Sequence, residues 1–527
     1  MMTDFPWLTT LVLVPAVGAL VVLALGRTAA RSRVREMALA ISLVEVGVLF
    51  GALTQFDTGQ SQVHQLAETH AWIPQLGTSW ALGADGVSML LVALAVGLVP
   101  LVIGAAWREN LPTDGSKGLG HTGTYLVLIL LLEAFMVTVF VARDVFLFYV
   151  VFEAMLIPVY FMIGGFGTGA QRRFAAVKFL IFSLAGGLIM LAAVIALYVN
   201  GPGGERGFLI DELTGYLAQN PMGTSTERLI FLGFFIAFAI KAPIVPVHTW
   251  LPDAAQAAPA GTSALLVGVL DKVGTFGMLA LCLPLFPTAS VWAAPVIVVL
   301  AVVSIIYGAL LAIGQSDLMR LIAYTSVSHF GFIVLGIFSF TSLSISGSSL
   351  YMLNHGISTG ALFLLAGFLI ARHPERSQRI ADYGGLQKVA PVLAGTFLVA
   401  GLSALSLPGL STFVSEIMVL LGTFATSRSA ALFAVVAVVL AALYVLMTYQ
   451  RVFTGKVPDE LAATPDLSGR ERWVVAPLLA GLVILGVYPA PALDMVREPA
   501  QTTMTAIGVV DAAPADDLAT AGEGSDS

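Results

Sequence analysis

Ionisable side chains stand inside long apolar segments of this 527-residue sequence, where each needs a partner or a function. Seven residues share this setting, each in a separate segment: Glu133, Glu153, Lys241, Lys272, His329, His355 and Glu416. A charge at the centre of a membrane-spanning helix costs about 2.5–3.5 kcal/mol on insertion scales. The positions of these residues are therefore the first guide to function.

The chemical types of these residues suit proton transfer. Carboxylates, amines and imidazoles that face a wet interior can pass a proton from one to the next. A Glu153–Lys241 pair would add a switch, because burial favours the neutral amine of Lys241 and a nearby carboxylate favours its charged form. For any single residue, a structural ion pair or a hydrogen bond that locks two helices is an equal alternative. Only the set as a whole favours proton transport.

Lys178 and His248 are secondary candidates, together with Glu133. Lys178 lies about one helical turn from Arg172 and Arg173, so snorkelling of its amine to the membrane surface explains it as well as proton transfer does. His248 lies near the end of its segment and can equally cap a helix. The spacing of His, Asp and Glu predicts no metal site. No Gly-rich loop follows a strand, so neither a nucleotide nor a nucleic acid is expected as a ligand.

The composition is that of an integral membrane protein. Hydrophobic residues make up 58% of the chain and charged residues 11%, and the mean hydropathy is +0.92. Soluble domains are near half apolar and a quarter charged. Cys282 is the only cysteine, which excludes a disulfide, an iron–sulfur cluster or a thiolate zinc site within the chain.

About fourteen segments are near or above the length that crosses roughly 30 Å of hydrocarbon. They lie at 5–25, 36–54, 84–106, 122–141, 145–166, 174–199, 227–247, 255–284, 290–313, 318–340, 346–371, 390–424, 429–450 and 473–493. The sequence therefore predicts an all-α membrane protein.

The basic residues predict the orientation. If the connection after the first segment is cytoplasmic, eighteen of the 25 basic residues lie on the cytoplasmic side, and Lys241 and Lys272 remain in the bilayer. The outer side then holds Arg143, Arg206, Arg228, Arg428 and Arg497. Because cytoplasmic loops carry an excess of Lys and Arg, both termini are predicted on the outer face.

Two of the segments are predicted to contain broken helices. Pro243 and Pro246 follow Lys241 directly, and Pro408 with Gly409 interrupts the twelfth segment. Proline removes an amide donor and clashes with the preceding turn. Non-helical backbone at membrane depth is tolerated only where it is buried in protein or faces a cavity, so a pair of such breaks points to a transport site.

The spacing of the charged residues predicts an internal repeat. Lys241 and Glu416 are 175 residues apart, and Glu153 and His329 are 176 apart. Each pair is five segments apart, an odd number, so the second copy would be inverted in the membrane. Chance spacing is the alternative. We expect two inverted five-helix repeats, helices 4–8 and 9–13, each with one broken helix.

These patterns divide the chain into five parts. They are an N-terminal region of three helices (1–121), the first repeat (122–284), the second repeat (285–454), a C-terminal helix (455–495) and an acidic tail predicted to be disordered (496–527).

Four stretches resemble the antiporter-like membrane subunits of respiratory complex I. They are 143–158, 241–253, 318–331 and 355–363, and the resemblance extends from the fourth to the twelfth segment. The resemblance implies that Glu153 and Lys241 match the pair of charged residues on the family's fifth and seventh helices. It also implies that Lys272 matches the central lysine on the eighth helix. His329 and His355 match connecting positions on the family's hydrophilic axis.

Glu416 matches the family's terminal group, where most members carry Lys and one of three bacterial subunit types carries Glu. The sequence resembles that type, and it also departs from the family. Ala255 and Ala257 stand where family members often have His and Glu, so a proton route through those two groups is in doubt. Asp271 beside Lys272 is also unusual.

The resemblance implies a proton-translocating subunit of NADH–quinone oxidoreductase in the bacterial inner membrane. No cofactor is expected in this chain, and NADH, FMN, iron–sulfur clusters and quinone are expected in partner subunits. The expected partners are other membrane subunits of complex I, including two neighbouring antiporter-like subunits, and the lipid bilayer. A subunit of a multi-subunit sodium/proton antiporter, or a passive scaffold whose charges lock helices, are the alternatives.

Overall fold

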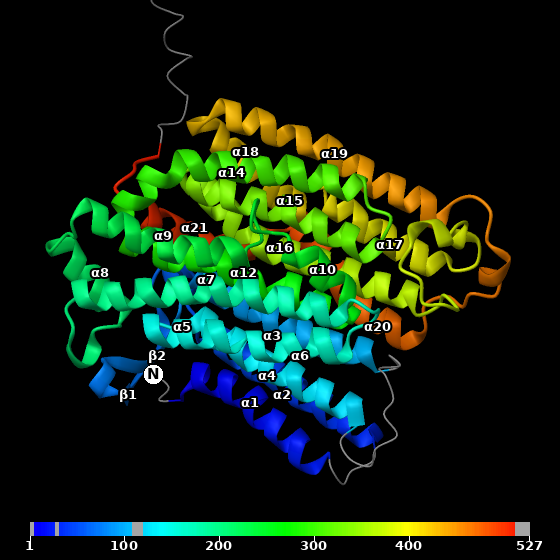
Figure 1. Ribbon diagram of the computed structural model, residues 1–527, viewed down its shortest axis with the longest axis horizontal. Coiled ribbons are helices and arrows are strands. Elements are labelled where there is room, and N and C mark those ends of the chain that lie inside the picture. Colours follow the sequence, from blue (N-terminus) through cyan, green and yellow to red (C-terminus); the bar gives the residue numbers. More distant parts are fainter. Residues whose placement is uncertain (1–4, 27–30, 108–119, 512–527) are drawn as a thin grey trace, which may run out of the picture.

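The computed structural model describes residues 5–26, 31–107 and 120–511. Within these ranges the chain forms a bundle of helices that run side by side along one direction (Figure 1). The first half supplies α1 (Trp7–Leu25), α2 (Arg31–Gln55), α3 (Gly86–Ala106), α4 (Gly120–Val141), α5 (Val145–Ala154), α6 (Leu156–Phe166), α7 (Arg172–Asn200), α8 (Ile210–Gln219), α9 (Thr224–Lys241) and α10 (Trp250–Ala257).

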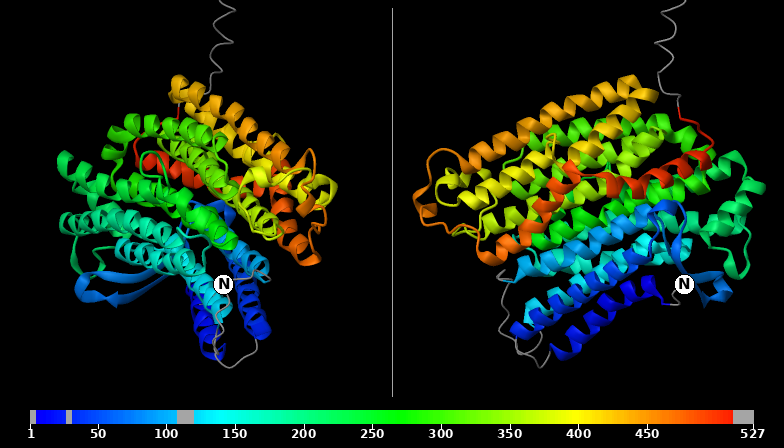
Figure 2. Two further views of the ribbon diagram at one scale, coloured as in Figure 1. Left: turned by 45° about the vertical axis from the view of Figure 1, so that its right-hand side comes forward. Right: turned by 180° about the vertical axis from the view of Figure 1, so that it is seen from behind.

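The second half of the chain completes the bundle, and α18 and α19 lie at the edge opposite α1 and α2 (Figures 1 and 2). It supplies α11 (Ala260–Leu265), α12 (Lys272–Gly277), α13 (Leu283–Leu285), α14 (Pro287–Ile313), α15 (Leu318–Phe338), α16 (Ser342–Ile370), α17 (Pro391–Ala404), α18 (Ser411–Thr426), α19 (Arg428–Phe453), α20 (Gly469–Val487) and α21 (Ala490–Ala506). Two π-helical segments, Leu266–Leu270 and Met278–Cys282, join α11, α12 and α13 into one run.

The predicted fold class is confirmed, and each of the fourteen predicted segments contains helix. Among the described residues, eleven helices are long and apolar enough to cross a membrane unaided. The pair α20 and α21, bent by 67°, makes a twelfth. The remaining two segments are the ones that the prolines were predicted to break: α9 followed by α10, and α17 followed by α18.

Among the eleven helices that can cross a membrane, the least apolar ones are the innermost. In their apolar windows, 94% of the residues are buried in α15 and in the run from Ala260 to Leu285, and 83% in α16. The corresponding share is 39% in α7 and α14 and 33% in α19. Polar side chains in the bilayer are tolerated where they face the bundle interior, so the candidate proton carriers of α12, α15 and α16 lie where the fold can partner them.

Three features of the fold were not predicted. β1 (Gln65–Ile73) and β2 (Thr78–Ala84) form an antiparallel hairpin, and Glu68 accepts hydrogen bonds from the first amides of α1. The segment 145–166 is divided into α5 and α6 next to Pro158.

The third feature is that α21 continues past residue 496, where the tail was predicted to begin. Val496, Ala500 and Met504 lie on a buried face of α21, so these residues pack where the prediction saw only a solvated tail. The acidic residues from 512 onward lie outside the described residues.

One buried ion pair connects the end of α16 to the start of α20. The guanidinium of Arg372 contacts both carboxylate oxygens of Glu471, at 2.6 and 3.2 Å, and each side chain is only 9% exposed. Glu471 also accepts hydrogen bonds from the amide and hydroxyl of Ser468 and so caps α20. This bidentate geometry is the strong form of an ion pair.

We expect Glu471→Ala to destabilise this end of the bundle by about 3–5 kcal/mol, because it leaves a buried guanidinium without its partner. The melting temperature of the purified complex in detergent measures the effect. Asp494→Ala is the matched control, because Asp494 and Arg497 form an exposed pair on α21, whose loss should cost at most about 1 kcal/mol. Equal melting temperatures for the two variants would contradict the prediction.

Candidate functional site

The first predicted helix break lies directly after Lys241. α9 ends at this residue, a turn segment containing Pro243 and Pro246 follows, and α10 begins at Trp250. Side chains satisfy the backbone groups that the break frees: the indole of Trp250 donates to the carbonyl of Ile240 at 3.0 Å, and Ser304 Oγ accepts from the amide of Val245 at 2.8 Å. Lys241 thus stands at the carboxyl end of a helix, where the helix dipole favours a cation.

The second predicted break, at Pro408 and Gly409, separates α17 from α18. Ser406 within it has a φ of +60°, and Gly409 has a φ of +92°. Asn354 of α16 donates to the carbonyl of Ser411 at 2.7 Å, which supports the first turn of α18. Both predicted breaks are confirmed, and each lies beside one of the candidate residues.

Lys272 of α12 and His355 of α16 are in direct contact. Lys272 Nζ lies 2.7 Å from His355 Nδ1 and donates to the carbonyl of Val267 at 2.5 Å. Both side chains are fully buried. At this distance the two nitrogens form a hydrogen bond, in which a protonated Lys272 donates to His355 when Nδ1 carries no proton. π-helical turns flank α12, and such turns are frequent at functional sites.

A second hydrogen-bonded chain begins at His329 of α15. The His329 and His355 rings lie 5.2 Å apart between centroids. His329 Nδ1 lies 2.7 Å from the hydroxyl of Tyr351, which donates to Glu416 Oε2 at 2.8 Å, and the same oxygen accepts from Ser406 at 2.5 Å. The order along the axis is therefore Lys272, His355, His329, Tyr351 and Glu416.

Small residues let α16 approach α18 closely enough for this contact. A Cβ added to Gly347 would lie 2.8 Å from Met418 Cβ and 3.1 Å from the carbonyl of Ser415. Residues four apart lie on one face of a helix, so Gly347, Tyr351 and His355 form a row on α16. The row directs Tyr351 toward Glu416, which follows Ser415 in α18.

Glu153 and Lys241 do not form a direct ion pair in this structure. Lys241 Nζ has no hydrogen-bond partner among the described residues and lies 4.9 Å from the centre of the Phe152 ring. Glu153 is partly exposed, interacts electrostatically with Lys241, and lies so close to Gly187 of α7 that a Cβ there would overlap its carboxyl.

Asp271 is a third ionisable residue in the interior, beside the two buried lysines. It is fully buried, its carboxylate has no hydrogen-bond partner among the described residues, and it interacts with both Lys241 and Lys272. A Cβ added to Gly274, three residues on, would lie 2.5 Å from the carbonyl of Phe238. Asp271 and Gly274 share one side of the helix, so this side faces α9, which ends at Lys241.

The three secondary candidates lie away from this axis. Lys178 forms an ion pair with Asp253 at 2.7 Å and donates to the carbonyl of Thr249. His248 is buried beside the rings of Tyr307 and Tyr324.

Glu133 of α4 is fully buried against Glu45 of α2, also fully buried, and the two carboxyls interact. Glu45 stands mid-segment in 36–54, the same signal that identified Glu133, and the sequence analysis missed it. It also missed Tyr351, although Tyr351 lies one helical turn from His355, and Ser406, which only the backbone of the break brings to Glu416.

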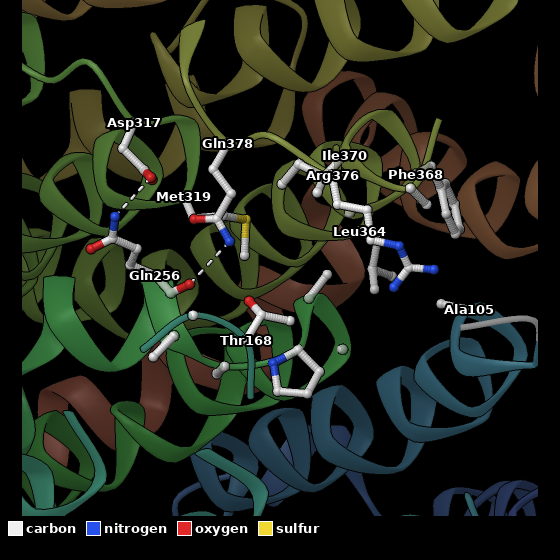
Figure 3. A pocket seen from close by; sticks show the side chains of 18 of the residues that line it. Ala105, Thr168, Gln256, Asp317, Met319, Leu364, Phe368, Ile370, Arg376 and Gln378 are labelled. Atoms are coloured by element: carbon white, nitrogen blue, oxygen red, sulfur yellow. Dashed lines mark hydrogen bonds between the residues drawn. The ribbon is translucent and has the colours of Figure 1, made fainter. Parts of the chain in front are cut away.

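A cavity of about 1190 Å³ opens at one end of the bundle, and Figure 3 shows part of its wall. The side-chain amide of Gln256 donates to Asp317 at 2.8 Å, and the backbone carbonyl of Gln256 accepts from the side-chain amide of Gln378 at 3.1 Å. Asp253 also lines the cavity and pairs with Arg320 at 2.5 Å. Burial raises the pKa of Asp317 at the start of α15, although hydrogen bonds from the Arg320 amide and Gln256 oppose this rise. Part of the wall is therefore polar and carries charged pairs.

Comparison with known proteins places this architecture in one family. A family model described as NADH:quinone oxidoreductase/Mrp antiporter, TM, matches residues 142–442. The chain is 48% identical to NADH-quinone oxidoreductase subunit M of Mycobacterium tuberculosis, over 97% of this chain and 96% of that protein. It is 38% identical to subunit M of Rhodobacter capsulatus, over 89% of this chain and 90% of that protein.

Two solved structures share the fold. A chain of respiratory complex I from Thermus thermophilus with bound NADH aligns with a TM-score of 0.83 and 31% identity, over 95% of this chain and all of that chain. A chain of the Mrp complex from Dietzia aligns with a TM-score of 0.80 and 21% identity, over 95% of this chain and 100% of that chain, a likeness in fold alone.

The chain therefore belongs to the family of antiporter-like membrane subunits of NADH:quinone oxidoreductases and Mrp antiporters. The subunit type that Glu416 predicted is subunit M, and the resemblance to it is confirmed.

We expect Gly187→Ala to reduce proton transport as strongly as loss of the Glu153 carboxyl does, because the added methyl occupies the place of that carboxyl. Proton uptake by inside-out membrane vesicles measures the effect. Gly165→Ala on α6 is the control, since a Cβ there meets nothing within 4 Å. Normal uptake in Gly187→Ala would show that the position of the Glu153 carboxyl is not critical.

We expect Asp271→Asn to shift the pH profile of proton uptake toward acid. The substitution keeps the side-chain volume and removes the negative charge that favours protonated Lys241 and Lys272. Asp271→Glu, which keeps the charge, is the control. An unchanged profile in Asp271→Asn would mean that Asp271 is electrostatically silent during turnover.

Proposed function

We propose that this chain translocates protons as a membrane subunit of a respiratory NADH:quinone oxidoreductase. The observation that carries the proposal is the buried run of titratable side chains from Lys272 to Glu416, in which Lys272 contacts His355, and His329 reaches Glu416 through hydrogen bonds. A structural role alone would not need an amine, two imidazoles and a carboxylate in succession across four helices.

In this proposal, protons enter from the cytoplasm through the cavity of about 1190 Å³. The ends of the segments around it carry many of the basic residues that predict the cytoplasmic side. Gly261 lines the cavity, and Lys272 follows eleven residues later, roughly 16 Å along the helix. Asp253, Gln256 and Asp317 supply the polar wall, while Ala255 and Ala257 offer no titratable group.

From Lys272 the proton passes to His355, then to His329, and leaves toward the outer face near Glu416. The two imidazole rings pack directly against each other, with 5.2 Å between their centroids. Glu153 and Lys241 set which half of the route is open, because the charge on Lys241 acts on Lys272 through Asp271.

The energy comes from partner subunits. Moving one charge against 100 mV costs about 2.3 kcal/mol. Oxidation of NADH and reduction of quinone supply it, with FMN and iron–sulfur clusters held by those partners. Two neighbouring antiporter-like subunits and lipid would cover the apolar outer faces of α7, α14 and α19, in a bacterial inner membrane with both termini outside.

The test is NADH-driven proton uptake by inside-out vesicles that carry Glu153→Gln or Lys272→Met, with the amount of assembled complex measured in the same membranes. We expect normal assembly and a fall in uptake of at least fivefold, because each variant removes a group that must change its charge. Gln501→Ala, on the exposed side of α21, is the control.

Two outcomes would replace the proposal. Unchanged NADH oxidation and uptake, together with lost sodium tolerance of the cells, would favour the sodium/proton antiporter, whose fold this chain shares with the Mrp complex. Loss of assembled complex in proportion to lost uptake would favour a scaffold.

A further inference from the structure

We propose that the hydroxyl of Tyr351 carries the proton between His329 and Glu416, so that this phenol is a member of the translocation route. The inference rests on the proposed function and deepens it, because neither the sequence patterns nor the family resemblance assigned Tyr351 a role. It stands on three short contacts among buried side chains.

The Tyr351 hydroxyl donates one hydrogen bond and accepts another. Tyr351 has one O–H, and that O–H donates to Glu416 Oε2 at 2.8 Å. The contact of 2.7 Å to His329 Nδ1 must then be one in which Tyr351 accepts. His329 therefore presents a proton at Nδ1, directed at the oxygen of a group that is already donating toward a carboxylate. This is the arrangement from which a concerted transfer starts.

Tyr351 also forms the connection between His329 and Glu416. Within the described ranges, it is the only side chain that hydrogen-bonds to both His329 and Glu416. Phe332 lies against its ring at 6.2 Å between centroids, and Tyr351 is fully buried. Removing the hydroxyl would leave an apolar gap between the imidazole and the carboxylate.

The transfer balances without any further reactant. His329, protonated on both nitrogens, gives its Nδ1 proton to the oxygen of Tyr351, while the original proton of Tyr351 passes to Glu416. The products are neutral His329, neutral Tyr351 and protonated Glu416. After Glu416 releases its proton, the Tyr351 O–H rotates from His329 back to Glu416, and His329 takes up the next proton from His355, which restores the starting state.

Ser406 positions the acceptor for this step. Its hydroxyl donates to the same carboxylate oxygen that Tyr351 reaches, at 2.5 Å, from the break between α17 and α18. Ser406 has a φ of +60°, a strained conformation for a non-glycine residue that persists where the surroundings determine it. The hydrogen bond to Glu416 is one such determinant. The break thus holds the carboxylate in reach of Tyr351.

The first experiment compares Tyr351→Phe with Glu416→Gln and with the double variant, in vesicles with measured assembly. We expect proton uptake in Tyr351→Phe to fall to the level of Glu416→Gln, and the double variant to be no worse than either. Residues that act in one unit are non-additive in this way. Tyr198→Phe is the control, because the Tyr198 hydroxyl lies 3.5 Å from the carbonyl of Gly204, in the connection after α7 and away from the axis.

A second variant separates proton transfer from positioning. A fluorinated tyrosine introduced at position 351 keeps the ring and the hydroxyl but makes the hydroxyl more acidic. We expect the pH profile of uptake to shift in this variant, whereas a hydroxyl that only positions its neighbours would leave the profile in place.

The outcomes distinguish this inference from the proposed function. If Tyr351→Phe pumps normally, or the fluorinated variant keeps the parental pH profile, while Lys272→Met and Glu416→Gln fail, Tyr351 is not a proton carrier and the proposed function stands. If Lys272→Met and Glu416→Gln also pump normally, the proposed function itself is overturned.

Discussion

A polar group in the hydrocarbon of a membrane has no water to bond to, so it must find a partner within the protein or cost several kcal/mol. This constraint explains why, among the helices that can cross a membrane, the run from α11 to α13, α15 and α16 are both the most buried and the least apolar. It also explains the breaks: the indole of Trp250 and the amide of Asn354 partner backbone carbonyls that lie beside them. Non-helical backbone is tolerable here because the surrounding side chains replace water.

The two breaks lie on opposite sides of the charged residues beside them. Lys241 precedes its break and so ends α9, where the exposed carbonyls of a helix favour a cation. Glu416 follows its break and lies in the second turn of α18. The subunit type with glutamate at this position is compatible with the local backbone.

The sequence was sufficient to predict the helices, both breaks and six of the residues on or near the axis, because each of these leaves a local signal: an apolar run, a proline, or a charge where none is expected. Contacts between helices leave no such signal. The order of His355 and His329 depends on how α15 and α16 face α12, and the link through Tyr351 depends on the small residues that bring α16 to α18. Ser406 reaches Glu416 only through a backbone conformation that serine seldom adopts. The β1–β2 hairpin was not predicted, because its sequence lacks a strong turn signal.

The satisfied and unsatisfied groups are distributed unequally along the axis. Lys272 contacts His355, and His329, Tyr351, Glu416 and Ser406 are joined by short hydrogen bonds, whereas Lys241 and Asp271 are buried without hydrogen-bond partners among the described residues. A satisfied network resists change, since altering one member leaves another unpaired. An unsatisfied pair of charges responds strongly to its neighbours, because nothing screens them in a low dielectric. The region with Glu153, Lys241 and Asp271 is therefore the one that responds most to a nearby charge, and Glu153 is the one of these three that is partly exposed.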